Sequence, residues 1–72
     1  MSAQERQGLS LVTRREMEVL SLIARGATNS EIAAEMVIAE TTVKTHVSSL
    51  MSKLAARDRV AMVLVAQRAG IA

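Results

Sequence analysis

The chain has 72 residues and a formal net charge of +2, with no Cys, Pro, Phe, Tyr or Trp and a single histidine. A chain of this length holds one domain and buries only about 60% of the surface that its unfolded form exposes, so its core is small. The missing cysteines exclude disulfides, thiolate metal sites and thiol catalysis, and the missing aromatic rings exclude base stacking. One histidine supplies no metal site by itself, and no apolar run approaches the roughly 20 residues of a membrane span. We therefore expect a cytoplasmic protein without metal, cofactor or membrane contact.

The composition also indicates the fold class. The apolar residues are mostly Ala, Leu, Val, Ile and Met, and glycine occurs at only three positions. This composition favours an all-α domain. The net charge is weak evidence about partners, but its distribution is more informative, because residues 41–59 carry four cations against one carboxylate. A basic segment of this kind favours a polyanionic partner.

Residues 1–11 are polar and irregular, and Gly8 is expected to break any helix there. We interpret this stretch as a flexible N-terminal segment or the remnant of a linker to a missing domain. Residues 12–72 then form the folded domain.

The first expected helix spans about residues 14–25. Thr13 and Glu16 have the spacing of a capping box, in which the threonine hydroxyl accepts from a free backbone N–H and the glutamate reaches back. Apolar residues follow at helical spacing, and Arg25 with Gly26 supplies a cation and a glycine stop. Capping is thus the expected duty of Glu16, ahead of acid catalysis.

A second, shorter helix is expected over about residues 29–36, where Thr28 and Glu31 form another capping box. Only residues 37–39 separate it from the next helix, and Ile38 is expected to fill the corner between them. Two helices joined by so short a turn form a helix-turn-helix.

The third expected helix, over residues 40–54, has two chemically different faces. Its apolar face carries Val43, Val47, Leu50, Met51 and Leu54 at helical spacing, which predicts burial. Its other face carries short hydroxyls around one lysine, a set that we call the polar strip: Thr41, Lys44, Thr45, Ser48 and Ser52. A solvated face usually carries long charged side chains of both signs. A slim, polar face with almost no carboxylate instead suits the major groove of duplex DNA, although an ordinary solvated face remains the alternative.

The fourth expected helix spans about residues 59–68, with Asp58 as its N-cap. Its sequence VAMVLVA is apolar nearly all round, which is more than one small core can cover. The surplus suggests a second copy related by two-fold symmetry, and the alternative is a helix that is simply well buried. The little polar contrast leaves the outer face undefined, and the candidate dimerisation residues are Val60, Val63, Leu64, Val65 and Arg68.

The run from Val12 to Ile71 resembles the LuxR/FixJ/NarL-type DNA-binding domain of bacterial response regulators and quorum sensors. The resemblance rests on TRRE, EVL and LIARG in the first helix, NSEIA in the second, TVKTHV in the third, and KL followed by RDRV. Sigma-factor region 4 shares the REMEVL, EIA and TVK elements. His46 and the RDRV entry into the last helix favour the LuxR type.

The resemblance implies a four-helix helix-turn-helix domain whose third helix enters the major groove and whose fourth helix dimerises. It assigns base contacts to Lys44, Thr45 and Ser48, with Thr41 near the edge. It assigns phosphate contacts to Thr28, Asn29, Thr42 and Lys53, and His46 is divided between a phosphate contact and a structural role. Free N–H groups at a helix start make phosphate contacts there physically sensible.

Three positions depart from the family pattern. Ala39 stands where a serine N-cap is usual, which removes a side-chain acceptor worth about 1 kcal/mol. Ala55 replaces a glycine and puts a left-handed ending of the third helix in doubt. Ser48 occupies a position that is often basic, so phosphate anchoring is expected to be weaker.

Sequence-specific binding of double-stranded DNA by a bacterial transcription regulator is therefore the predicted function. The partners would be two-fold related half-sites, a second copy, and an N-terminal regulatory domain absent from this chain. One alternative is a protein-interaction module that uses the fourth helix, and another is a domain like sigma-factor region 4. An enzyme is not expected, because no second histidine, cysteine or convergent acid pair is available for a catalytic site.

Overall fold

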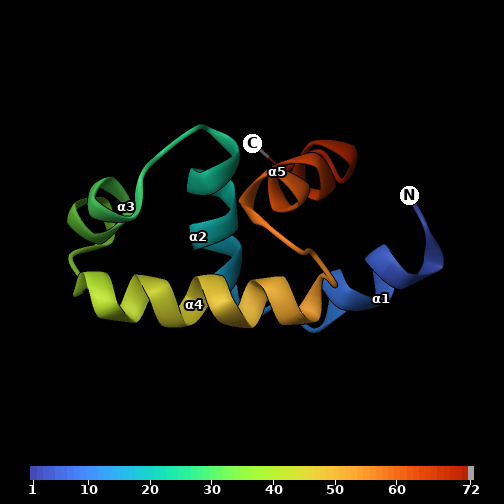
Figure 1. Ribbon diagram of the computed structural model, residues 1–72, viewed down its shortest axis with the longest axis horizontal. Coiled ribbons are helices and arrows are strands. Elements are labelled where there is room, and N and C mark those ends of the chain that lie inside the picture. The colour runs from blue at the N-terminus through green and yellow to red at the C-terminus, as the bar shows by residue number, and fades with distance from the viewer. Residues whose placement is uncertain (72) are drawn as a thin grey trace.

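A computed structural model describes residues 1–71, which form five α-helices (Figure 1). The helices are α1 (Ala3–Ser10), α2 (Arg14–Ala24), α3 (Asn29–Met36), α4 (Glu40–Lys53) and α5 (Arg59–Arg68). The last four confirm the helices expected from the sequence, with α2 and α4 each one residue shorter than expected because Arg25 and Leu54 are their C-caps. The all-α helix-turn-helix fold is therefore confirmed.

Both predicted capping boxes are formed. At α2 the Glu16 N–H donates to Thr13 Oγ1 over 3.2 Å, and the Thr13 N–H donates to Glu16 Oε1 over 2.9 Å. At α3 the same two bonds join Thr28 and Glu31 over 3.1 and 2.8 Å. Asp58 caps α5 by accepting from the Ala61 N–H at 2.8 Å. Each cap satisfies donors that the first turn of a helix leaves free, which fixes where these helices begin.

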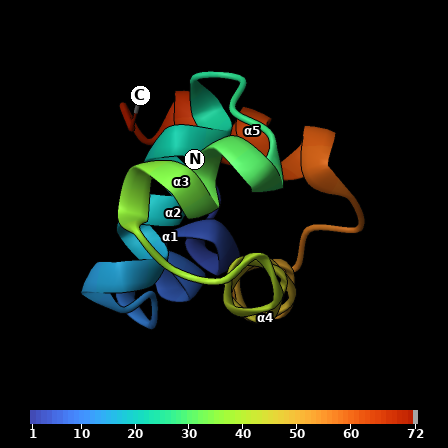
Figure 2. The same ribbon diagram turned by 90° about the vertical axis from the view of Figure 1, so that its left-hand side faces the viewer.

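The helix α2 stands across α4, with α3 near one end of α4 and α5 on the other side of α2 (Figure 1). Seen along its axis in Figure 2, α4 lies at the edge of the molecule with the other helices to one side. The core lies where α2 meets α4 and α5, and its buried side chains are Val19, Leu20, Ile23, Ile32, Val43, Leu50, Leu54, Met62, Val65 and Ala66. The core therefore supports only the inner face of α4.

The helix α1 corrects the expectation that Gly8 breaks any helix near the N-terminus. Ser2 caps α1 by accepting from the Glu5 N–H, and Gly8 is buried against the end of α4, where an added Cβ would overlap the Lys53 carbonyl oxygen. Arg68 of α5 also holds α1, through two hydrogen bonds to the Glu5 carboxylate of 2.9 and 3.2 Å. The glycine thus allows close packing, which offsets its low helix propensity.

Two left-handed residues mark the ends of α3 and α4. Val37 has φ 56° and ψ 50° at the end of α3, and Ala55 has φ 52° just after α4. A left-handed ending after α4 is therefore present although alanine replaces the usual glycine, which corrects the expectation at Ala55. Ile38 packs against the core at the corner between α3 and α4, as expected, and Ala39 makes no side-chain cap bond. Within residues 1–71 no helix is long and apolar enough to cross a membrane.

Candidate nucleic-acid interface

The polar strip lies on the side of α4 that faces away from the core. Thr41, Lys44, Thr45, Ser48 and Ser52 are all exposed. On the opposite side Val43, Leu50 and Leu54 are buried, and Val47 and Met51 pack half-buried against the core. Figure 2 shows α4 end-on, with its outer side uncovered by the other helices. The two faces predicted from helical spacing are therefore present.

The chemistry of the polar strip is set by one cation and several short hydroxyls. Thr45 Oγ1 donates to the Thr41 backbone oxygen over 3.1 Å, so its proton is occupied and its lone pairs remain available to an outside donor. Lys44 is exposed next to it and can donate to guanine O6 or N7. Ser48 is short enough to let the backbone of α4 approach a partner closely. The strip therefore offers both donors and acceptors at the outer surface of the helix.

Four of the five residues assigned to phosphate contacts fall into two groups. Thr28 and Asn29 lie at the start of α3, where Thr28 is exposed and Asn29 is half-buried. Thr42 and His46 lie one turn apart on α4, the first exposed and the second half-buried. A helix start presents free N–H groups and the positive end of its dipole, which favours anions. The start of α3 thus offers the helix dipole to a phosphate, with the Glu31 carboxylate in the same first turn.

Lys53 has a different partner from the one expected. Its Nζ lies 2.7 Å from Glu16 Oε1, and its side chain is 27% exposed. Ser49 Oγ also donates to Glu16, through Oε2. The structure therefore gives Lys53 an intramolecular contact at the end of α4. One of its three N–H donors is used in this way, and the phosphate contact that the resemblance implies stays a prediction.

Glu16 is the buried centre of this contact. It is 5% exposed. Burial by itself opposes ionisation of the carboxyl, but hydrogen bonds from Lys53, Ser49 and the Thr13 N–H, together with the charge of Lys53, outweigh it and lower the pKa of Glu16 from 4.5 to about 2. Glu16 is therefore a carboxylate at neutral pH that fastens the C-terminal half of α4 to the start of α2.

The candidate dimerisation residues of α5 divide by exposure. Val60 and Leu64 are 68% and 47% exposed and lie one turn apart, while Val63 is half-buried. Val65 is only 4% exposed and belongs to the core, so its assignment to a surface contact is wrong. Arg68 is exposed at the end of α5 but pairs with Glu5. The uncovered apolar surface of α5 is thus centred on Val60 and Leu64.

Sequence reasoning missed two side chains that organise this region. The sequence predicts only a capping role for Glu16 and no role for Arg59, whose side chain joins the starts of α5 and α3. Each makes contacts with residues at least 30 positions away in the sequence. Helical spacing gives no signal for such contacts, because it relates residues of one helix only. Among residues 1–71, no three His, Asp or Glu side chains are placed to share a metal ion.

Comparison with known proteins agrees with the geometry. The model of a family described as "Bacterial regulatory proteins, luxR family" matches residues 10–66. The chain is 50% identical over 62 residues to the "Uncharacterized transcriptional regulatory protein YhcZ" of Bacillus subtilis, which covers 86% of this chain and 29% of that protein. It is 52% identical over 56 residues to the "Response regulator protein VraR" of Staphylococcus aureus, with coverage of 78% and 27%. The VraR of Staphylococcus epidermidis matches equally well. The chain thus spans less than a third of the length of these relatives.

Proposed function

Because the chain belongs to the luxR family of bacterial regulatory proteins and carries that family's helix-turn-helix DNA-binding domain, we propose that it recognises specific double-stranded DNA by inserting α4 into the major groove. Lys44, Thr45 and Ser48 contact base edges, and Thr41 lies near the edge of the groove. The single observation that supports this proposal most is the exposed polar strip on α4, which lies opposite an apolar face that packs against the core. Binding requires no covalent step, so the domain acts without catalysis.

Phosphate contacts position α4 in the groove. Thr28 and Asn29, at the start of α3, contact one segment of the DNA phosphate backbone. Thr42 and His46, on the side of α4, contact another. Lys53 adds a weaker contact to this set, because one of its three N–H donors is bonded to Glu16. Sigma-factor region 4, which shares several of the same sequence elements, is not the favoured alternative, because the family match is to luxR regulators.

Two copies bind two half-sites about one helical turn of DNA apart, through a contact between their α5 helices. Val60 and Leu64 support this arrangement, because they form an exposed apolar pair on one side of α5. In a cytoplasmic regulator of the length of YhcZ or VraR, an N-terminal domain would control when α4 and α5 become available.

The test of groove binding is Lys44→Ala, measured on duplexes selected from a random pool at a stated salt concentration. Affinity for the selected duplex should fall by about 1–3 kcal/mol, because a base-contacting donor is lost. Arg57→Ala is the control, since it removes one positive charge from an exposed residue outside the polar strip. Equal affinities of Lys44→Ala and the unmodified domain would refute the assignment of α4.

The test of pairing is Leu64→Lys, measured by sedimentation with and without a duplex that carries both half-sites. Cooperative occupancy should be lost, because a charge replaces the apolar contact. Leu11→Lys is the matched control, since Leu11 is also an exposed leucine but lies outside α5. If Leu64→Lys leaves cooperativity intact, α5 does not join the copies, and the apolar pair would instead serve contact with another protein.

A further inference from the structure

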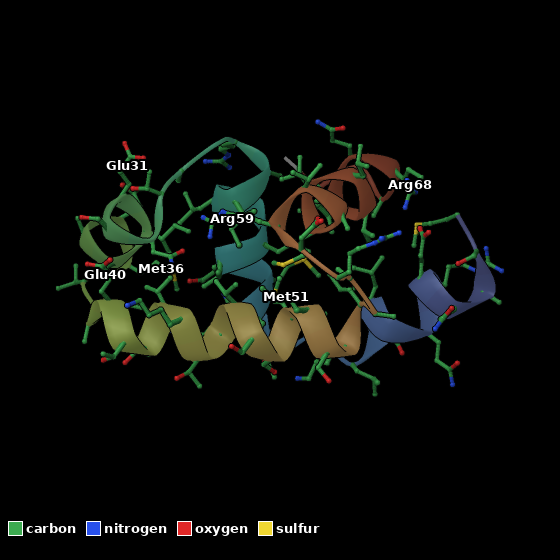
Figure 3. All side chains as sticks on the ribbon, in the orientation of Figure 1. Glu31, Met36, Glu40, Met51, Arg59 and Arg68 are labelled. Atoms are coloured by element: carbon green, nitrogen blue, oxygen red, sulfur yellow. The ribbon has the colours of Figure 1, made fainter. Side chains whose placement is uncertain are left out.

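The side chain of Arg59 bridges the first residue of α5 and the first residue of α3. Its Nη1 donates to Asn29 Oδ1 over 2.7 Å, and its Nη2 donates to the Ala27 backbone oxygen over 2.7 Å. Figure 3 shows Arg59 at the start of α5, on the side of α2 and α3. Arg59 and Asn29 are both half-buried, so this contact is partly shielded from water. The planar guanidinium fork therefore holds two acceptors in fixed positions.

This contact determines how the Asn29 amide is oriented. An asparagine side chain has one acceptor oxygen and one NH2 donor group, and its hydrogen bonds decide which of them faces outward. Since Oδ1 receives Arg59, the two N–H bonds of Nδ2 remain for another acceptor. The neighbouring Thr28 is also fixed, because its hydroxyl accepts from the Glu31 N–H. The first turn of α3 is thus held so that Asn29 presents donors.

We propose that Arg59 is a positioning residue for DNA binding, which orients the Asn29 NH2 group toward a phosphate without touching the DNA itself. The proposal rests on the proposed function, because it takes Asn29 as a phosphate contact. Arg59 would then link α5, the proposed pairing helix, to the phosphate contact at the start of α3. Arg59 is the first residue of α5, so displacement of α5 would move the group that orients the phosphate contact of α3.

A positioning residue, a direct phosphate ligand and a purely structural residue predict different results. A direct ligand contributes its charge, so its loss would reduce the slope of log affinity against log salt by about 0.9. A positioning residue contributes geometry, so its loss should lower affinity equally at every salt concentration. A purely structural residue affects the free energy of unfolding and leaves the affinity of the folded fraction unchanged.

The experiment measures affinity for the selected duplex over a salt series, together with urea unfolding, for Arg59→Ala, Arg59→Lys, Asn29→Ala and the Asn29→Ala/Arg59→Ala double variant. We expect Arg59→Ala to weaken binding about 10- to 150-fold, the size of one hydrogen bond to a charged group, with an unchanged salt slope. Arg59→Lys should weaken it similarly, since lysine keeps the charge but lacks the fork. The double variant should bind no more weakly than Asn29→Ala.

Asn29→Asp keeps the proposal testable if Arg59→Ala fails to fold. It retains an oxygen for Arg59 and removes the NH2 donor, so stability should be kept while binding weakens. A reduced salt slope in Arg59→Ala, full affinity in Arg59→Lys, or additive losses in the double variant would overturn the proposal. Lys44→Ala in the same assay distinguishes failure of the proposed function from failure of the positioning role of Arg59. If neither Lys44→Ala nor Asn29→Ala weakens binding, the proposed function itself fails. If both weaken it and the Arg59 variants do not, only the positioning role fails.

Discussion

The two halves of α4 are held in the molecule by different means. Near its C-terminal end, Ser49 and Lys53 both donate to the buried carboxylate of Glu16, which ties this half to α2. At its N-terminal end, α4 begins at Glu40, and its N-cap residue Ala39 makes no side-chain cap bond and lies two residues after the left-handed Val37. Thr41, Lys44 and Thr45 of the polar strip lie in this N-terminal half and are exposed. The contacts that anchor α4 to α2 and most of the residues that we propose to read bases therefore lie at opposite ends of one helix, and substitutions should affect stability and DNA binding separately.

The largest expected effect on stability comes from breaking the anchored half with Glu16→Ala. The free energy of unfolding should fall by about 2–3 kcal/mol, because the variant removes a buried capping carboxylate and leaves Ser49 and Lys53 without their acceptor. Urea unfolding at pH 7 measures this loss.

Glu31→Ala is the matched control, since Glu31 completes the same kind of capping box on α3 but is exposed. Its loss should cost only about 0.5–1 kcal/mol. Equal losses in the two variants would show that the contacts of Ser49 and Lys53 add nothing to the cap.

The pH dependence of stability sharpens the same contrast. The pKa of Glu16 is about 2 in the folded protein, below its usual 4.5, so folding favours the ionised carboxylate. Its contribution is fully present above about pH 4.5 and is lost as the pH falls toward 2. Between pH 5 and pH 2, we expect the unmodified domain to lose about 1–3 kcal/mol more of its free energy of unfolding than Glu16→Gln does.

The comparison requires urea unfolding of both proteins at several pH values in that range. Glu16→Gln keeps the size of the side chain and cannot ionise, so the remaining carboxyl groups report the background. Parallel curves for the two proteins would contradict the low pKa of Glu16.

Most of the fold could be predicted from the sequence, because it depends on local signals. The capping boxes at Thr13 and Thr28 fix the starts of α2 and α3, and the apolar spacing of α4 predicts which face is buried. The polar strip and its exposure follow from that same spacing. What failed depends on contacts between distant segments: Gly8 lies in a helix because it packs on the backbone of Lys53, and Val65 is buried because α5 packs on α2.

The candidate site shows the same division. Lys44 could be selected from the sequence as an exposed cation on a slim face, but the ion pair of Lys53 depends on Glu16, 37 residues away. The role of Arg59 depends on where the loop before α3 passes the start of α5. No periodic pattern in α5, which is apolar nearly all round, distinguishes the exposed Leu64 from the buried Val65 beside it.

A smaller effect is expected from strengthening the N-terminal half of α4 with Ala39→Ser. Ala39 already has the extended backbone of an N-cap, with φ −69° and ψ 148°, so serine can accept from a free N–H of the first turn without rearrangement. The free energy of unfolding should rise by about 0.5–1 kcal/mol at pH 7. A matched Ala34→Ser substitution, at an exposed position inside α3, should give no gain. A similar gain in both variants would show that capping is not the cause.

The smallest expected effect comes from Val37→Gly at the turn before α4. Val37 is 88% exposed, so its side chain contributes little packing, while a left-handed conformation strains a β-branched residue by roughly 1–2 kcal/mol. Glycine removes that strain but gains freedom in the unfolded chain, which leaves a net stabilisation of about 0.5 kcal/mol. Ala55→Gly is the control, because Ala55 has a similar φ of 52° after the anchored half of α4 and a smaller side chain. Urea unfolding should show a larger gain in the free energy of unfolding for Val37→Gly than for Ala55→Gly. The reverse order would mean that the left-handed residue after α4 is the more strained of the two.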